Sequence, residues 1–289
     1  MASKTSPTAK KRYKPIIVGA VVVLFIAGLF AYLYARYQAS LGPVINPTDA
    51  TAKAPSPAKM LTELFNRNVQ STIMRDNRES CNLSKVDDRD HCISISKPVV
   101  KVIGGTTHAY AYIQAEIDNA AHFEGGSIRL LYAAVDALGK SMLIDSGYMP
   151  DGNGGGLAPH VELIQINRSG EMGWLVSSGF TNQGLSIGTD LLYALADGKI
   201  HLMGRFETLY DNTGQLTTEE EAEKGLSLTG KLEPVFDGLP ADEPAALNYI
   251  ITVKRGTGQQ EVQRFTVPFN SRVNQYVIPE AAKKMFPSP

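Results

Sequence analysis

Residues 108–117 read HAYAYIQAEI, and this stretch sets the fold class of the chain. Small and large side chains alternate along it, and a period of two places successive side chains on opposite faces of a β-strand. The stretch ends at Asp118 and Asn119, residue types that favour turns. We therefore expect a strand here that is followed directly by a turn.

Similar strand-sized runs recur through the rest of the chain and end at turn signals such as Asp197-Gly198. Such punctuation at intervals of roughly 8–12 residues is typical of antiparallel β-structure. The sequence therefore predicts a mainly β, antiparallel domain that resembles a sandwich or a barrel. A meander or a propeller-like sheet is an alternative, because residues 160–180 and 190–210 both run strand, turn, strand. The other predicted strands are residues 127–138, 141–149, 161–166, 171–177, 191–195, 199–209, 246–254, 261–269 and 275–278.

Residues 60–74, which precede the strands, predict a short amphipathic helix. Leu61, Phe65 and Ile73 belong to an apolar set that recurs at steps of three and four residues. We expect this helix to pack on the β-domain; docking to a membrane partner is the alternative.

Residues 16–34 form an unbroken apolar run, IIVGAVVVLFIAGLFAYLY. Nineteen helical residues span about 28 Å, which matches a hydrocarbon core about 30 Å thick. The basic residues Lys10, Lys11, Arg12 and Lys14 precede the run, and this asymmetry places the N-terminus in the cytoplasm. The run is longer than the apolar region of a signal peptide. Large residues also occupy the positions at which a signal-peptide cleavage site requires small ones. We predict an uncleaved transmembrane helix at residues 15–36, after a basic cytoplasmic tail at residues 1–14.

Residues 37–58 are rich in Pro, Ala, Ser and Thr and predict an extended linker. Residues 59–289 then form a β-rich domain outside the membrane. This organisation indicates a single-pass protein of the bacterial inner membrane whose C-terminal domain lies in the periplasm.

The two cysteines, Cys81 and Cys92, are predicted to form a disulfide, because an oxidising compartment favours the paired state. The enclosed segment is polar and offers no apolar face to hold it. We expect a loop that the disulfide closes.

The charge of the chain argues against a nucleic-acid partner. Its 289 residues carry 28 basic and 29 acidic groups, a net charge of −1. Binding to phosphates requires a basic surface.

No catalytic residues and no cofactor are predicted. The sequence contains neither G-x-S-x-G nor H-E-x-x-H, and its five histidines are scattered singly. An envelope hydrolase that uses carboxylates is an alternative function. Its candidate residues are Glu116, Asp136, Asp145 and Glu207.

The stretch DGNGGG at residues 151–156 resembles part of a calcium loop. Asp151, Asn153 and Glu162 fall at positions 1, 3 and 12 of such a loop and supply the hard oxygens that calcium prefers. Gly155 occupies position 5, where a calcium loop carries a ligand. We expect a hairpin loop here, with a calcium-stabilised binding module as the alternative.

Residues 174–184, WLVSSGFTNQG, combine aromatic and amide side chains without a charged residue. Trp174, Phe180, Asn182 and Gln183 are the candidate binding residues, for a glycan or for a protein. The alternative is a strand and turn with Trp174 in the core. We predict a tethered binding or assembly module whose partner is another envelope protein or a component of the cell wall.

Overall fold

The computed structural model describes residues 54–74, 80–150, 152–218, 221, 223–256 and 258–287. The chain divides into two units after Ala52, and the described residues belong to the second unit. Within the described part, no helix has the length and apolar character needed to cross a membrane. The predicted tail, the transmembrane segment and most of the linker lie outside the described residues.

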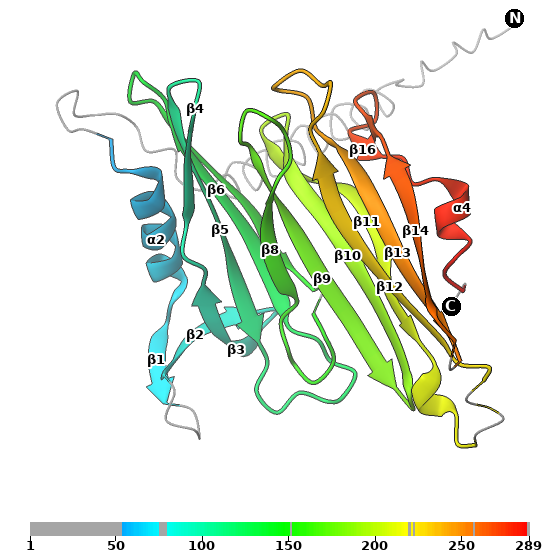
Figure 1. Ribbon diagram of the computed structural model, residues 1–289. Coiled ribbons are helices and arrows are strands. Elements are labelled where there is room, and N and C mark those ends of the chain that lie inside the picture. The colour runs from blue at the N-terminus through cyan, green and yellow to red at the C-terminus, as the bar shows by residue number, and fades with distance from the viewer. Residues whose placement is uncertain are drawn as a thin grey trace, which may run out of the picture. The chain divides into compact units, whose positions relative to one another are not determined.

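Sheet A, the first of two large antiparallel sheets, has the strand order β1-β2-β3-β5-β6-β7, and β4 also pairs with β5 (Figure 1). The prediction of a mainly β, antiparallel domain is therefore confirmed. The strands are β1 (Ser71–Met74), β2 (Ser80–Val86), β3 (Arg89–Ile95), β4 (Val99–Ile103), β5 (Thr106–Glu116), β6 (Ser127–Val135) and β7 (Ser141–Met149).

Strands β3 and β4 follow one another along the same edge of β5. Residues 92–95 of β3 pair with residues 113–116, and β4 pairs with residues 106–110. Ser96 fills the gap, because its N–H donates to the Tyr112 carbonyl and its hydroxyl accepts from the Tyr112 N–H, both at 2.9 Å. The eleven residues of β5 are thus paired almost throughout.

Sheet B is an uninterrupted meander with the order β14-β13-β12-β11-β10-β9-β8. Strands β11 and β12 pair over only three residues, from Leu209↔Thr229 to Asp211↔Ser227. The strands are β8 (His160–Gln165), β9 (Met172–Asn182), β10 (Leu185–Ala196), β11 (Lys199–Asp211), β12 (Leu226–Val235), β13 (Ala246–Arg255) and β14 (Gln260–Val267), and the 3-10 helix η1 (Thr213–Gln215) follows β11.

Helix α2 (Pro57–Asn68) covers one face of sheet A, as Figure 1 shows. It begins where the Ser56 hydroxyl accepts the Lys59 N–H at 3.4 Å and Pro57 supplies a preset φ angle. Leu61 and Phe65 are buried against sheet A, where several small alanines of β5 lie in the same apolar cluster.

The predicted helix is too long at its C-terminal end. Residues 71–74 form strand β1 and pair with β2 instead. The Gln70 N–H already donates to the Leu83 carbonyl at 2.8 Å. The β-branched Thr72 and Ile73 suit this extended backbone better than a further helical turn.

The opposite face of β5 and β6 packs on sheet B. Tyr110, Tyr132 and Trp174 are fully buried in this layer, and the rings of Tyr110 and Trp174 lie 5.7 Å apart. The indole N–H of Trp174 donates to the Ala111 carbonyl at 3.0 Å. The single tryptophan therefore joins the two sheets through both its ring and its polar atom.

The C-terminal elements cover the other face of sheet B. Tyr276 and Phe286 are buried in one cluster with Phe206 and Tyr249. The Tyr276 hydroxyl donates to the Ala245 carbonyl at 3.0 Å. These elements are β15 (Phe269–Asn270), β16 (Gln275–Tyr276) and α4 (Glu280–Lys283).

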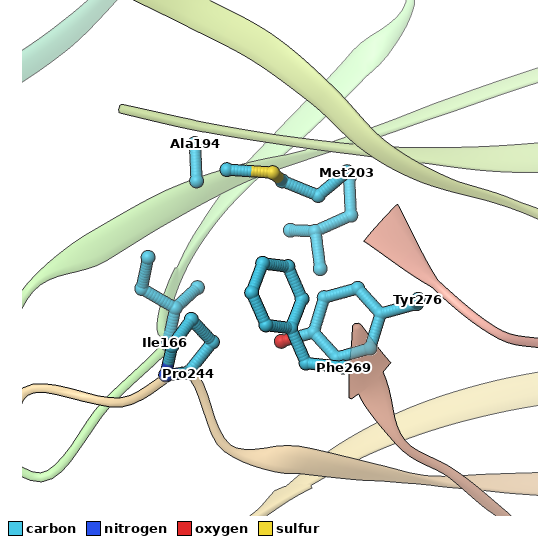
Figure 2. A pocket seen from close by; sticks show the side chains of 7 residues that line it. Ile166, Ala194, Met203, Pro244, Phe269 and Tyr276 are labelled. Carbon is cyan, nitrogen blue, oxygen red and sulfur yellow. The ribbon is translucent and has the colours of Figure 1, made fainter. Parts of the chain in front are cut away.

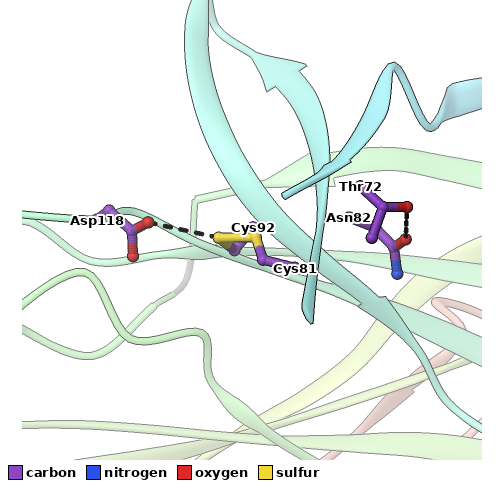
Figure 3. The surroundings of a disulfide bond; sticks show 5 residues. All are labelled: Thr72, Cys81, Asn82, Cys92 and Asp118. Carbon is purple, nitrogen blue, oxygen red and sulfur yellow. Dashed lines mark hydrogen bonds between the residues drawn. A yellow bond between two sulfur atoms is a disulfide. The ribbon is translucent and has the colours of Figure 1, made fainter. Parts of the chain in front are cut away.

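The Cys81–Cys92 disulfide is present, with a Cα–Cα distance of 5.4 Å. It joins β2 to β3, and Asp118 Oδ2 lies 3.5 Å from Cys92 Sγ (Figure 3). The expectation of a loop between the cysteines is wrong, because residues 82–91 form most of a β-hairpin. Val86 and His91 are buried, so the hairpin has an inner face.

Reduction of the disulfide is expected to destabilise the domain. A closed loop of this length lowers the entropy of the unfolded chain by an amount worth roughly 3 kcal/mol. Dithiothreitol should therefore lower the melting temperature of the wild type, followed by near-UV circular dichroism. It should leave a Cys81→Ser/Cys92→Ser variant unchanged; an equal shift in both proteins would show that the reductant acts elsewhere.

Candidate functional site

A surface hollow of about 230 Å³ lies where two loops meet the end of β9. One loop, residues 117–126, joins β5 to β6, and the other, of which residues 150 and 152–159 are described, joins β7 to β8. The hollow is lined by His122, Asn153, Gly154, Gly179, Phe180 and Thr181. Two segments that the sequence singles out separately, the glycine stretch and the 174–184 segment, thus contribute to one site.

Backbone hydrogen bonds hold the two loops together. The Gly155 N–H donates to the His122 carbonyl at 3.0 Å, and the Gly156 N–H donates to the Glu124 carbonyl at 2.7 Å. The Gly126 N–H donates to the Leu157 carbonyl at 2.8 Å. The Glu124 carboxylate also pairs with Arg89 at 2.9 Å, which ties this loop to the β2–β3 hairpin.

Glycines of both loops permit this close approach of the two backbones. A Cβ atom on Gly126 would lie 2.5 Å from the Ala115 carbonyl oxygen and 2.7 Å from the Ala158 nitrogen. One on Gly154 would overlap the His122 carbonyl oxygen. These positions therefore need glycine for space. The expectation of a hairpin loop at residues 151–156 is wrong, because β7 and β8 belong to different sheets and the loop connects them.

The lining of the hollow combines two rings with amide and hydroxyl groups. The His122 and Phe180 ring centroids lie 6.1 Å apart, with the planes tilted by 50°. Asn153 Oδ1 accepts the Gly179 N–H at 2.6 Å, which fixes the amide against β9. The Thr181 hydroxyl bonds with that of Ser186 at 2.9 Å. No acidic side chain, lysine or arginine is present among the six lining residues.

The candidate binding residues are divided between the core and the surface. Trp174 is fully buried between the sheets, so its ring is not exposed to a surface ligand. Phe180 is 38% exposed and lines the hollow. Asn182 and Gln183 are exposed at the β9–β10 turn, where Gln183 adopts a left-handed φ of 48°. Of the four candidate binding residues, Phe180 is therefore the one that lines the hollow.

Two of the three residues proposed for calcium, Asn153 and Glu162, lie in the described part of the chain. Asp151 lies outside the described residues, and Asn153 fixes β9 through its carbonyl oxygen. Glu162 is an exposed residue of β8. Among the described residues, no three His, Cys, Asp or Glu side chains are placed to hold a metal ion.

The carboxylates of the alternative hydrolase serve four different local structures. Asp136 accepts the Leu138 and Lys140 N–H groups of a turn, and Asp145 forms an ion pair with Arg129. Glu207 accepts from the Thr189 hydroxyl at 3.2 Å, and Glu116 lies opposite Cys92 in the β3–β5 pairing.

A second, apolar cavity lies between sheet B and the C-terminal elements that cover it (Figure 2). Its free volume is about 10 Å³, and its walls include Met203, Phe269 and Tyr276. This is about the space that one water molecule needs. The cavity is therefore a packing defect of the core and has no room for a ligand.

Asp190 is the most deeply buried acidic side chain in the described part of the chain, at 9% exposure. Burial raises the pKa of its carboxyl, while the Ser177 and Thr208 hydroxyls lower it and Glu162 raises it further. The Thr208 hydroxyl donates to Asp190 Oδ1 at 3.2 Å. His160, Ser177 and Asp190 occupy matching positions on β8, β9 and β10.

No protein-family model, curated protein or solved structure matches this chain. The site is therefore interpreted from its own residues.

His122 carries no distinguishing signal in the sequence, whereas Gly179 and Thr181 belong to the 174–184 segment but not to its four candidate binding residues. His122 was one of five scattered histidines, and its place beside Phe180 depends on the packing of the two loops. Gly179 and Thr181 flank Phe180 within the segment already chosen.

We predict that Gly126→Ala destabilises the domain by about 2 kcal/mol, because overpacking against fixed backbone forces the loops apart. Urea unfolding measures the difference. Gly155→Asn is the matched control, since Gly155 has open space around it and a φ of 73° that Asn tolerates. Equal losses in the two variants would contradict the close-packing explanation.

Asp190→Asn is expected to stabilise the protein at pH 7 by on the order of 1 kcal/mol, because it removes a buried charge and keeps an oxygen acceptor. The raised pKa means that the folded state binds more protons than the unfolded state, so the free energy of unfolding falls as pH rises from about 4 through the folded pKa. The advantage of the variant should shrink toward zero near pH 3. Urea unfolding at both pH values tests this, and a less stable variant at pH 7 would disprove it.

Proposed function

We propose that this chain is a single-pass protein of the bacterial inner membrane whose periplasmic β-domain is a non-catalytic binding module. Its partner is another envelope protein or a component of the cell wall, and the hollow is the contact site. The observation that carries the proposal is the convergence of the glycine loop and residues 179–181 on one hollow. The apolar run at residues 16–34 and the proline-rich linker support the anchored arrangement.

The fixed loops support a binding role. Binding costs less when the contact groups are ordered beforehand, and hydrogen bonds and glycine contacts already position His122, Asn153 and Phe180. The four candidate carboxylates of the hydrolase alternative lie on different elements, and none of them lines the hollow, which supports binding over acid–base chemistry.

The direction of α2 also supports the proposal. Gln70, two residues after the C-terminal end of α2, donates its N–H to the Leu83 carbonyl. Leu83 pairs with Cys92 of β3, and Cys92 in turn pairs with Glu116 of β5. The helix therefore ends near the Glu116 end of β5, where the loops of the hollow begin. The twelve residues of α2 span about 18 Å. The helix also contacts β4, so its N-terminal end lies about that far from the Glu116 end of β5. The described chain thus starts at the end of α2 that is away from the hollow.

Site-specific crosslinking in intact cells tests the proposal. A photoreactive benzoylphenylalanine at Thr181 should give a defined adduct, sensitive to protease if the partner is a protein and to a wall-degrading enzyme if it is cell wall. The same probe at Leu138, which is 93% exposed on the β6–β7 turn, is the matched control. An adduct that also disappears in a Phe180→Ala background supports the site. Absence of an adduct at Thr181, or equal adducts at both positions, would overturn it.

A further inference from the structure

We infer that the hollow binds one sugar ring of a neutral, N-acetylated glycan strand, an inference that rests on the proposed function and names its ligand class. The six lining residues have the shape and chemistry that such a ligand requires. The ligand is carbohydrate from the cell wall, and a protein partner is the competing outcome of the test.

The two rings supply a surface for the face of a sugar. His122 and Phe180 lie side by side at 6.1 Å with a tilt of 50°, so they form an angled wall. The face of an aromatic ring is electronegative and attracts the weakly positive C–H groups on the face of a pyranose. Phe180 is 38% exposed at the surface of the hollow, so part of its side chain is accessible to such contact.

The remaining lining supplies polar groups for the rim of a sugar. The Asn153 amide is fixed by the Gly179 N–H at 2.6 Å, and its carbonyl oxygen has a second lone pair to offer. The Thr181 hydroxyl is positioned by Ser186. Gly154 leaves its backbone without a covering side chain. Hydroxyl and acetamido groups bind to such neutral donors and acceptors, and the lining has no carboxylate or ammonium group to select a charged ligand.

The size and position of the hollow favour a single ring over a polypeptide. Its volume of about 230 Å³ is below the range of roughly 300–1,000 Å³ typical of pockets for drug-sized ligands. An extended peptide binds by adding to the edge of a sheet. The hollow lies beyond the ends of β5 and β7, between loops whose backbone groups bond to each other. On its β9 side the Gly179 N–H already donates to Asn153, so this edge group is not free to pair with a peptide.

The test uses the full chain in lipid nanodiscs and the tetramer of N-acetylglucosamine as the probe. Saturation-transfer NMR should show contact with the sugar, and titration should saturate. Phe180→Leu keeps an apolar side chain and removes the ring, so we expect affinity to fall about tenfold. Phe180→Tyr keeps the ring and should retain affinity. Phe123→Leu is the matched control, because Phe123 is 78% exposed and does not line the hollow.

Three results would overturn the inference: no saturable binding by the wild type, equal affinity in Phe180→Leu and wild type, or an equal loss in Phe123→Leu. Thermal unfolding of each variant identifies any loss that comes from misfolding, and Phe180→Tyr then decides whether the ring is required. If the tetramer does not bind while the probe at Thr181 captures a protein, the glycan inference fails and the proposed binding function stands. If neither occurs, both fail.

Discussion

Burial of β5 and β6 on both faces is the constraint on which the rest of the domain depends. Ala109, Ala111 and Ala115 allow α2 to approach one face, and Tyr110 packs on Trp174 at the other. A strand that is covered on both sides must keep its register, because a slip of one residue would exchange its small and large side chains. The Trp174–Ala111 hydrogen bond further fixes the position of sheet B against this strand.

The hollow follows from the same arrangement. It forms where the loop after β5 meets the loop before β8, and Trp174 positions the strand that carries Phe180. The loops could not meet with ordinary side chains at Gly126, Gly152 and Gly154, since a Cβ atom there would overlap the opposing backbone. Rigid sheet packing and close loop packing together place a ring, an amide and a hydroxyl in one small site.

The alternating runs were the part of the fold that could be predicted. The 141–149 strand agrees with β7, and the turn at Asp197 and Gly198 has the positive φ angles of 50° and 70° that its residue types suggest. The β2–β3 hairpin was missed because its inner face includes Ser84 and His91, which are polar but buried. Strand β12 was missed because Gly230 and Pro234 interrupt its pattern. Glycine and proline report local preference, while here the pairing with β13 decides the structure.

The candidate site was predictable in pieces only. The two segments could be chosen by composition, but their contact depends on tertiary packing. This packing brings Asn153 against Gly179, which lies 26 residues later in the sequence. The burial of Trp174 and the position of His122 depend on the same packing.

The meander of sheet B has a consequence for how the chain folds. Each of its strands pairs with the strand next to it in the sequence, so the entropy lost in closing the intervening loops is small. The contact between Trp174 and Ala111 instead joins residues 63 apart. Contacts between residues far apart in the sequence form more slowly, so we expect the two sheets to dock after the meander of sheet B has formed.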